Sequence, residues 1–105
     1  MVFSRRDRSG QVGPGVEVTD RDPVEVVREL KAQPAEAGIW LCGGSALAGA
    51  LCDEIDRLVL KVNPVVLGAG LPLFASPASQ VRGFAREDCR TFDSGVVLST
   101  YRRTT

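Results

Sequence analysis

Two consecutive glycines, Gly43 and Gly44, constrain the fold of this chain more than any other feature. They follow the apolar run Ile39–Cys42, which has glycine on both sides and is typical of a short strand buried on both faces. A run of small residues comes directly after them, and we predict a helix over Ser45–Cys52 with Ser45 as its N-cap. The glycine pair therefore predicts a tight backbone turn between a buried strand and a closely packed helix.

A second strand follows this helix. The segment Leu58–Val62 alternates with the period of a strand, which places Leu58, Leu60 and Val62 on one face. Strand, helix and strand then form a crossover unit. Pro64 and the two glycines around Val65–Leu67 predict that this strand ends in a bend before Leu71–Phe74.

The first part of the chain predicts two strands and a covering helix. The first strand lies at Met1–Ser4, with no turn before it, and a short strand follows at Val16–Thr19. Asp22 and Pro23 form a strong helix start, so we predict a helix over Pro23–Gln33 that ends before Pro34.

The end of the chain predicts a β-hairpin. Its arms are Val81–Phe92 and Val96–Tyr101, joined by Asp93-Ser94-Gly95, in which Asp and Gly favour a turn. The whole order is β, β, α, β, α, β, β, β, with no internal repeat and no interdomain linker. This order predicts an α/β fold, a mixed sheet flanked by helices in a single domain over residues 1–105.

Composition restricts the class of protein. The 105 residues carry 13 basic and 13 acidic side chains, which argues against nucleic-acid and anionic-membrane partners. The longest mostly apolar stretch, Ile39 to Cys52, is too short to span a bilayer, so we expect a cytoplasmic protein. Without histidine, the three cysteines cannot form the usual zinc set, and Ser/His/Asp chemistry is excluded. A carboxylate site at Asp53, Glu54 and Asp56 is a weaker interpretation than a surface turn.

Two places offer phosphate-binding chemistry. The helix start after Gly43-Gly44 presents unpaired N–H groups, although such a glycine pair is also a common tight turn. After the first strand, hydroxyl and guanidinium groups suited to a phosphate monoester gather at Ser4, Arg5, Arg6 and Arg8. A solvated basic loop is the alternative interpretation of that segment.

Five segments occur in an order that resembles a known family: Phe3-Ser4-Arg5, Leu41 to Ser45, Asp53 to Asp56, Asn63 to Phe74, and Ser94 to Val97. This series is similar to the dihydrofolate reductase-like family that includes the C-terminal reductase domain of the bifunctional riboflavin-biosynthesis deaminase/reductase. The most specific segment is the P-V-V-L-G-x-G-x-P-L-F stretch. The resemblance covers nearly the whole chain.

The resemblance implies an NADPH-dependent reductase, or the cofactor-holding part of one, acting on a C=N or C=C bond. A pterin-like or ribosylamino-pyrimidine substrate, such as 5-amino-6-(5-phosphoribosylamino)uracil, is implied. The residues implied for the cofactor pyrophosphate are Gly43, Gly44, Ser45, Ala46 and Leu47, with Ser4 and Arg5 at the adenosine 2′-phosphate. No residue is assigned as a catalytic acid. The alternative is a noncatalytic remnant or a self-associating NADPH-binding module.

The chain departs from the family in two ways. It lacks a counterpart of the family's N-terminal strand and helix, so we expect an incomplete domain with two unpaired internal strand edges. A homo-oligomer, such as a dimer, or a complementing chain would cover them. The second departure is Cys42, where riboflavin-pathway reductases commonly carry an acidic residue, and this favours the broader set of family reductases.

Overall fold

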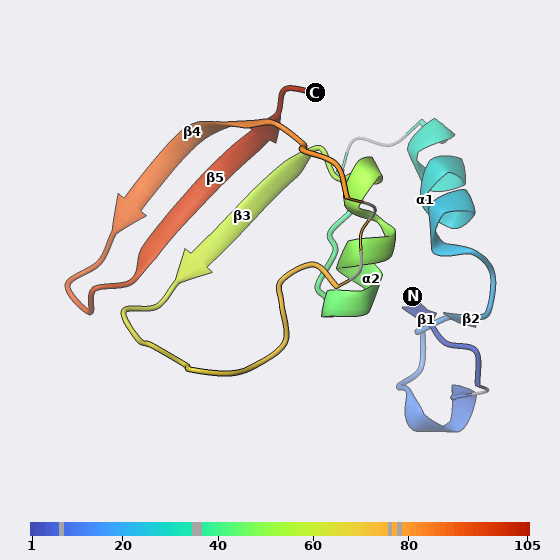
Figure 1. Cartoon of the computed structure of the whole chain (residues 1–105). Coiled ribbons are helices and arrows are strands. Elements are labelled where there is room, and N and C mark those ends of the chain that lie inside the picture. Colours follow the sequence, from blue (N-terminus) through green and yellow to red (C-terminus); the bar gives the residue numbers. More distant parts are fainter. Residues whose placement is uncertain (7, 35–36, 76, 78) are drawn as a thin grey trace. The chain divides into compact units, whose positions relative to one another are not determined.

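The computed structural model describes residues 1–6, 8–34, 37–75, 77 and 79–105 of the chain. It divides into two compact units, Met1–Cys42 and Gly43–Thr105. Strands and helices occur in both units (Figure 1), which confirms a mixed α/β fold.

The first unit contains a two-stranded parallel sheet. β1 (Val2–Phe3) pairs with β2 (Val18–Thr19), with Val2 opposite Val18 and Phe3 opposite Thr19. The short 3₁₀ helix η1 (Ser9–Gln11) lies on the connection between them. The predicted strand Val16–Thr19 is therefore shorter than expected: only its last two residues lie in register with β1, although the Glu17 carbonyl also accepts from the Val2 N–H at 2.7 Å.

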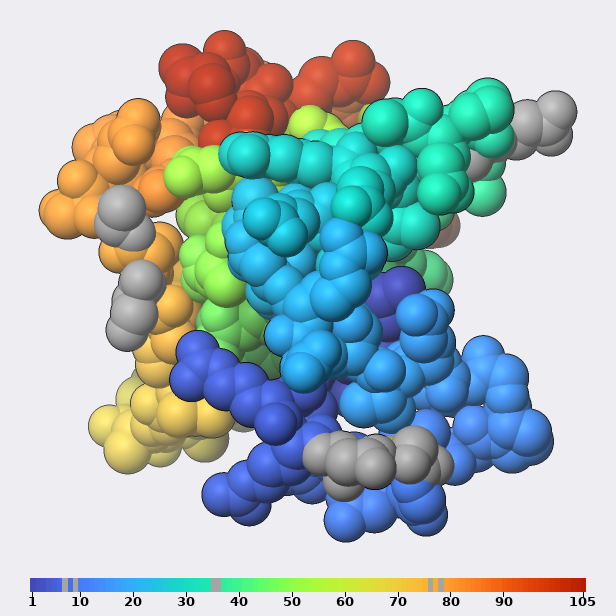
Figure 2. All heavy atoms as spheres, turned by 90° about the vertical axis from the view of Figure 1, so that its right-hand side faces the viewer, coloured from blue at the N-terminus to red at the C-terminus, as the bar shows by residue number. Residues whose placement is uncertain are grey.

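Helix α1 (Pro23–Ala32) confirms the predicted start and ends one residue earlier than predicted. The Asp22 side chain accepts a hydrogen bond from the Val24 N–H, and Gln33 is the C-cap. Val26 and Val27 are buried on one side. Figure 2 shows this helix, in light blue to cyan, at the surface of the first unit.

The predicted strand at Ile39–Cys42 is wrong. Residues 38–42 form no strand, and Trp40 is 87% exposed. A strand exists only through hydrogen bonds to a neighbour, and no strand among the described residues pairs with this segment. The apolar run is present in the sequence, but its expected burial on both faces is absent.

The second unit begins with α2 (Ser45–Ala50), which is followed by the 3₁₀ helix η2 (Cys52–Glu54). The predicted helix over Ser45–Cys52 is thus divided into two pieces at Leu51. Buried apolar residues concentrate here and on α1: Val26, Val27, Ala48, Leu51 and Cys52.

A three-stranded antiparallel sheet completes the second unit. β3 (Arg57–Val62) and β4 (Phe84–Thr91) both pair with the central strand β5 (Val97–Arg103), as Figure 1 shows. The predicted hairpin and the strand at Leu58–Val62 are confirmed, with bounds that differ by one to three residues. The segment between β3 and β4 contains no helix or strand in its described residues.

None of the helices in the described ranges has the length and apolar character needed to cross a lipid bilayer.

Candidate functional site

The backbone at Gly43 and Gly44 leads directly into α2. Gly43 has a backbone φ of +123°, which residues other than glycine rarely adopt. The peptide bond between the two glycines is cis. Gly44, with a φ of −97°, is the N-cap of the helix. Ser45 is therefore the first helical residue and not the predicted cap, and its hydroxyl donates to the Pro72 carbonyl.

The start of α2 faces open space. A Cβ added at Gly43 or Gly44 would meet no atom within 4 Å. The first bond inside the helix runs from the Ala48 N–H to the Gly44 carbonyl, at 2.8 Å. The N–H groups of Ser45, Ala46 and Leu47 precede that bond, so they have no acceptor within the helix. Together with the two glycines, these three residues are the ones that the family resemblance implies for a pyrophosphate.

The loop after β3 is attached to this helix start. The Ala75 N–H donates to the Ser45 carbonyl at 3.0 Å, and Pro72 accepts from the Ser45 hydroxyl. A Cβ at Gly49 would lie 1.8 Å from the Ala75 carbonyl oxygen, so only glycine permits this approach. The P-L-F part of the most specific sequence segment thus packs beside the candidate phosphate site.

Ser4 and Arg5 lie at the carboxyl end of β1, in the first unit. The Ser4 N–H continues the sheet by donating to the Thr19 carbonyl at 2.9 Å. The Ser4 hydroxyl oxygen accepts from the Arg6 N–H and from the Arg8 Nε, both at 3.2 Å. The loop after β1 is therefore folded around the serine hydroxyl, and the exposed Arg8 side chain is hydrogen-bonded to Ser4 and Gln11 of the same loop.

A hollow of about 340 Å³ opens at this end of the parallel strand pair, lined by Ser4, Arg5, Arg6, Val16, Val18, Thr19 and Asp20. The Arg5 and Arg6 side chains have no ion-pair partner among the described residues. Two guanidinium groups without an internal partner suit an anionic ligand, whereas the Asp20 carboxylate opposes one.

The predicted site residues fall into two groups. Ser4 and Arg5 belong to the unit Met1–Cys42, and Gly43 to Leu47 belong to the unit Gly43–Thr105. The first group lies in the loop after β1, and the second group lies at the start of α2.

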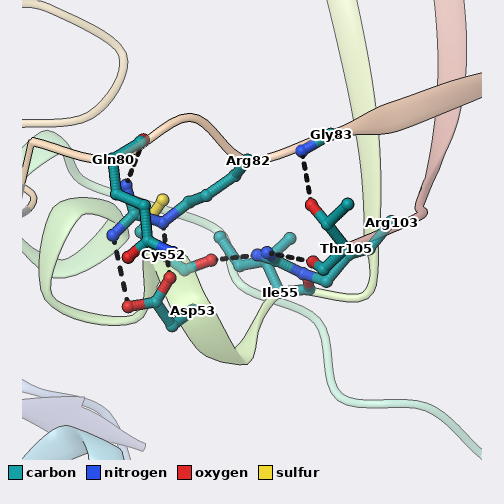
Figure 3. Close-up of polar contacts among 8 residues, drawn as sticks. All are labelled: Cys52, Asp53, Ile55, Gln80, Arg82, Gly83, Arg103 and Thr105. Atoms are coloured by element: carbon teal, nitrogen blue, oxygen red, sulfur yellow. Dashed lines mark hydrogen bonds and ion pairs between the residues drawn. The ribbon is translucent and has the colours of Figure 1, made fainter.

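A second polar cluster, which sequence reasoning missed, lies at the other end of α2 (Figure 3). Arg103 donates from Nε to the Ile55 carbonyl at 2.6 Å, and from its two terminal nitrogens to the Thr105 and Cys52 carbonyls. Its guanidinium also lies 4.9 Å from the centre of the Phe84 ring. Arg103 thus fixes the end of β5 to η2.

Arg82 makes the neighbouring connection in Figure 3. It forms a two-nitrogen ion pair with the Asp53 carboxylate, and it donates to the Gln80 carbonyl at 3.0 Å. The hydrogen bond from Arg82 lowers the pKa of Asp53, and the charge of Arg82 adds to this effect. The cavity beside these residues is about 360 Å³, but both arginines donate to groups of the chain itself, so we interpret the cluster as a structural joint. The bonds that join distant segments connect residues 29, 48 and 51 positions apart, so no local sequence signal marks the cluster.

Comparisons with known proteins identify relatives of this chain along most of its length. Residues 2–98 match the family model described as the RibD C-terminal domain. The uncharacterized protein YyaP of Bacillus subtilis (strain 168) is 38% identical over 80 residues, which are 74% of this chain and 42% of that protein. The uncharacterized protein YwjB of the same organism is 43% identical over 44 residues, which are 40% of this chain and 25% of that protein.

A solved structure with the same fold is similar to this chain. It is a chain described as a riboflavin biosynthesis protein from Shewanella sp. PV-4, with a TM-score of 0.64 and 21% sequence identity. The match covers 90% of the present chain and 55% of that chain. The present chain therefore spans about half the length, or less, of the relatives that it matches.

Proposed function

Because the chain belongs to the RibD C-terminal domain family, we propose that it forms the NADPH-holding part of a reductase. The substrate class is a pterin-like or ribosylamino-pyrimidine molecule, reduced at a C=N or C=C bond. The observation that carries this proposal is the family match over residues 2–98, because it includes both groups of candidate cofactor residues.

The start of α2 supports the pyrophosphate end of the proposal. Backbone N–H groups at Ser45, Ala46 and Leu47 suit phosphate oxygens, and the open side of Gly43 and Gly44 lets a ligand approach the main chain. The residues present at the start of α2 fit a pyrophosphate group. When bound, NADPH supplies the hydride, and the residues of this chain bind and orient it.

The hollow after β1 supports the adenosine end. It lies where two parallel strands end, which is where nucleotides bind in open α/β sheets. Arg5 and Arg6 suit a 2′-phosphate, and Asp20 suits a free ribose hydroxyl. The preference for NADPH over NADH therefore depends on which of these groups reaches the ribose.

The first test is calorimetric titration of the 105-residue chain with NADPH and with NADH. We expect saturable binding that favours NADPH. Arg5→Ala should weaken NADPH binding roughly tenfold or more, because a charge-assisted contact to phosphate is lost, and should change NADH binding little. If Arg5→Ala weakens the binding of both nucleotides equally, Arg5 does not contact the 2′-phosphate. If the folded, unaltered chain binds neither nucleotide, the proposal is overturned.

A second variant tests the pyrophosphate end. Gly44→Val places a branched side chain in the space beside the main chain, so NADPH binding should fall by about tenfold or more. Gly38→Val is the matched control, since a Cβ there also meets nothing within 4 Å but lies outside the candidate site. Similar affinities for the two variants would remove Gly44 from the site. Binding without turnover of any pyrimidine or pterin substrate would favour the alternative of an NADPH-binding module.

A further inference from the structure

The three charged residues that follow β2 have different partners. Asp22 accepts a hydrogen bond from the Val24 N–H and caps α1. Arg21 donates through both terminal nitrogens to the Glu29 carboxylate, at 2.9 and 2.6 Å. Asp20 lines the hollow at the end of the parallel strand pair, and its carboxylate has no hydrogen bond or ion pair with any other described residue. The carboxylate that faces the hollow is therefore the one that the fold does not use.

The loop after β1 separates its arginines in the same way. Arg8 is bound to the chain itself, since it donates to the Ser4 hydroxyl oxygen and to the Gln11 side chain at 3.0 Å. The exposed guanidinium groups of Arg5 and Arg6 line the hollow and have no hydrogen bond or ion pair within the described part of the chain. The hollow thus presents two positive groups and one negative group, none of them occupied by the fold.

This combination of charges distinguishes two forms of a ribose. Val16 and Val18 add an apolar part to the lining, which suits the flat face of a base or sugar. A phosphate monoester carries about two negative charges, so Arg5 and Arg6 attract it and Asp20 repels it. A free hydroxyl donates to a carboxylate, as in dinucleotide sites where an acidic residue binds the ribose 2′-hydroxyl. Asp20 therefore acts in opposite directions on the two forms.

We propose that Asp20 is a specificity-determining residue, which sets how strongly the hollow prefers a 2′-phosphate over a free 2′-hydroxyl on adenosine. The inference rests on the proposed function, because it takes the hollow as the adenosine end of the cofactor site. Arg5 and Arg6 give the preference its direction. Asp20 limits its size, so the chain accepts nucleotides of both kinds.

Two small nucleotides test the hollow by itself. Adenosine 2′,5′-bisphosphate and adenosine 5′-monophosphate differ only in the 2′-phosphate, and neither contains a nicotinamide or a pyrophosphate. Their binding therefore reports on the hollow and does not depend on the start of α2. NMR titration of the 105-residue chain measures both affinities, with the amides of residues 4–6 and 16–20 as reporters.

Asp20→Asn removes the charge with little change in shape. Loss of the repulsion should strengthen binding of the bisphosphate about fivefold, the size expected for a charge pair in an exposed site. Loss of the charged acceptor should weaken binding of the monophosphate about threefold. The ratio of the two affinities should thus rise about tenfold or more. A ratio equal to that of the parent would overturn the proposal.

Glu17→Gln is the matched control. It removes the same charge from an exposed residue of the same segment that does not line the hollow, so the ratio should stay within about twofold of the parent. A rise as large as that for Asp20→Asn would make the effect one of net charge and contradict the role of Asp20. Asp20→Ser removes the charge with a different side chain and gives the same test where Asp20→Asn does not fold.

The outcomes separate this inference from the proposed function. A folded chain that binds NADPH but neither small nucleotide would leave the reductase proposal standing and overturn the assignment of Asp20. A chain that binds both small nucleotides, with the expected response to Asp20→Asn, but does not bind NADPH would confirm Asp20 and overturn the reductase proposal.

Discussion

The two ends of α2 are built differently. At its start, Gly43 and Gly44 have open space where a side chain would be, and three N–H groups have no acceptor in the helix. Near its other end, Gly49 lies against the Ala75 backbone. There, two arginines bind the Cys52 and Ile55 carbonyls and the Asp53 carboxylate. The glycine and the arginines at the second end therefore stabilise the fold, whereas the glycines and N–H groups at the start remain available to a ligand.

We expect the largest difference in stability between two variants, Gly49→Ala and Gly44→Ala, which add the same methyl group at the two ends of α2. Gly49→Ala puts a Cβ within 1.8 Å of a backbone oxygen, which cannot rotate away, so unfolding free energy should fall by about 3 kcal/mol. Gly44→Ala meets nothing and should stay within about 1 kcal/mol of the parent. Urea unfolding of both variants measures the contrast. Equal losses would show that the two ends do not differ in packing.

The next largest effect concerns Arg103, in the structural joint at the second end of α2. Arg103→Lys keeps the charge but cannot reproduce donation to three carbonyls, so we expect a loss of about 2 kcal/mol in urea unfolding. Arg102→Lys on the adjacent, more exposed position is the control and should change stability much less. A loss for Arg103→Lys no greater than for Arg102→Lys would remove Arg103 from the structural joint.

The smallest effect is a dependence on pH. Hydrogen bonding to Arg82 lowers the Asp53 pKa in the folded chain. This pair therefore stabilises the fold above the unfolded pKa of aspartate, about 3.9, and the contribution is lost as pH falls through the folded pKa. Asp53→Asn should lower the urea midpoint slightly at pH 7 and reduce its decline below about pH 4.

Two acidic controls accompany that measurement. Asp93→Asn changes a carboxyl in the hairpin turn and is the control for the Asp→Asn substitution itself. Glu29→Gln should also reduce the decline, because its ion pair with Arg21 lowers the Glu29 pKa in the first unit. An Asp53→Asn profile parallel to that of the parent would contradict the role of the Arg82 pair.

Local signals were sufficient to predict several elements. Asp22 and Pro23 define the start of α1, alternation defines β3, and the turn at Asp93–Gly95 defines the hairpin. The local pattern also identified the glycine pair at the start of α2, and the family resemblance supplied its ligand, which stays a prediction.

Non-local features could not be predicted. The run Ile39–Cys42 has the composition of a buried strand, but composition does not specify a pairing partner, and the strand is absent. The Arg103 joint depends on carbonyls that lie 48 and 51 positions away. Gly49 occurs in a run of small residues, and only the position of Ala75 distinguishes it from the others.

The connections between the strands of the β3–β5–β4 sheet also predict the order in which these strands pair during folding. β4 and β5 are joined by residues 92–96, whereas pairing Val62 with Val97 encloses residues 63–96. Closing the longer loop costs roughly 2 kcal/mol more in chain entropy. The hairpin therefore forms first and serves as the template on which β3 aligns, so mutations in the turn should slow folding more than mutations in β3.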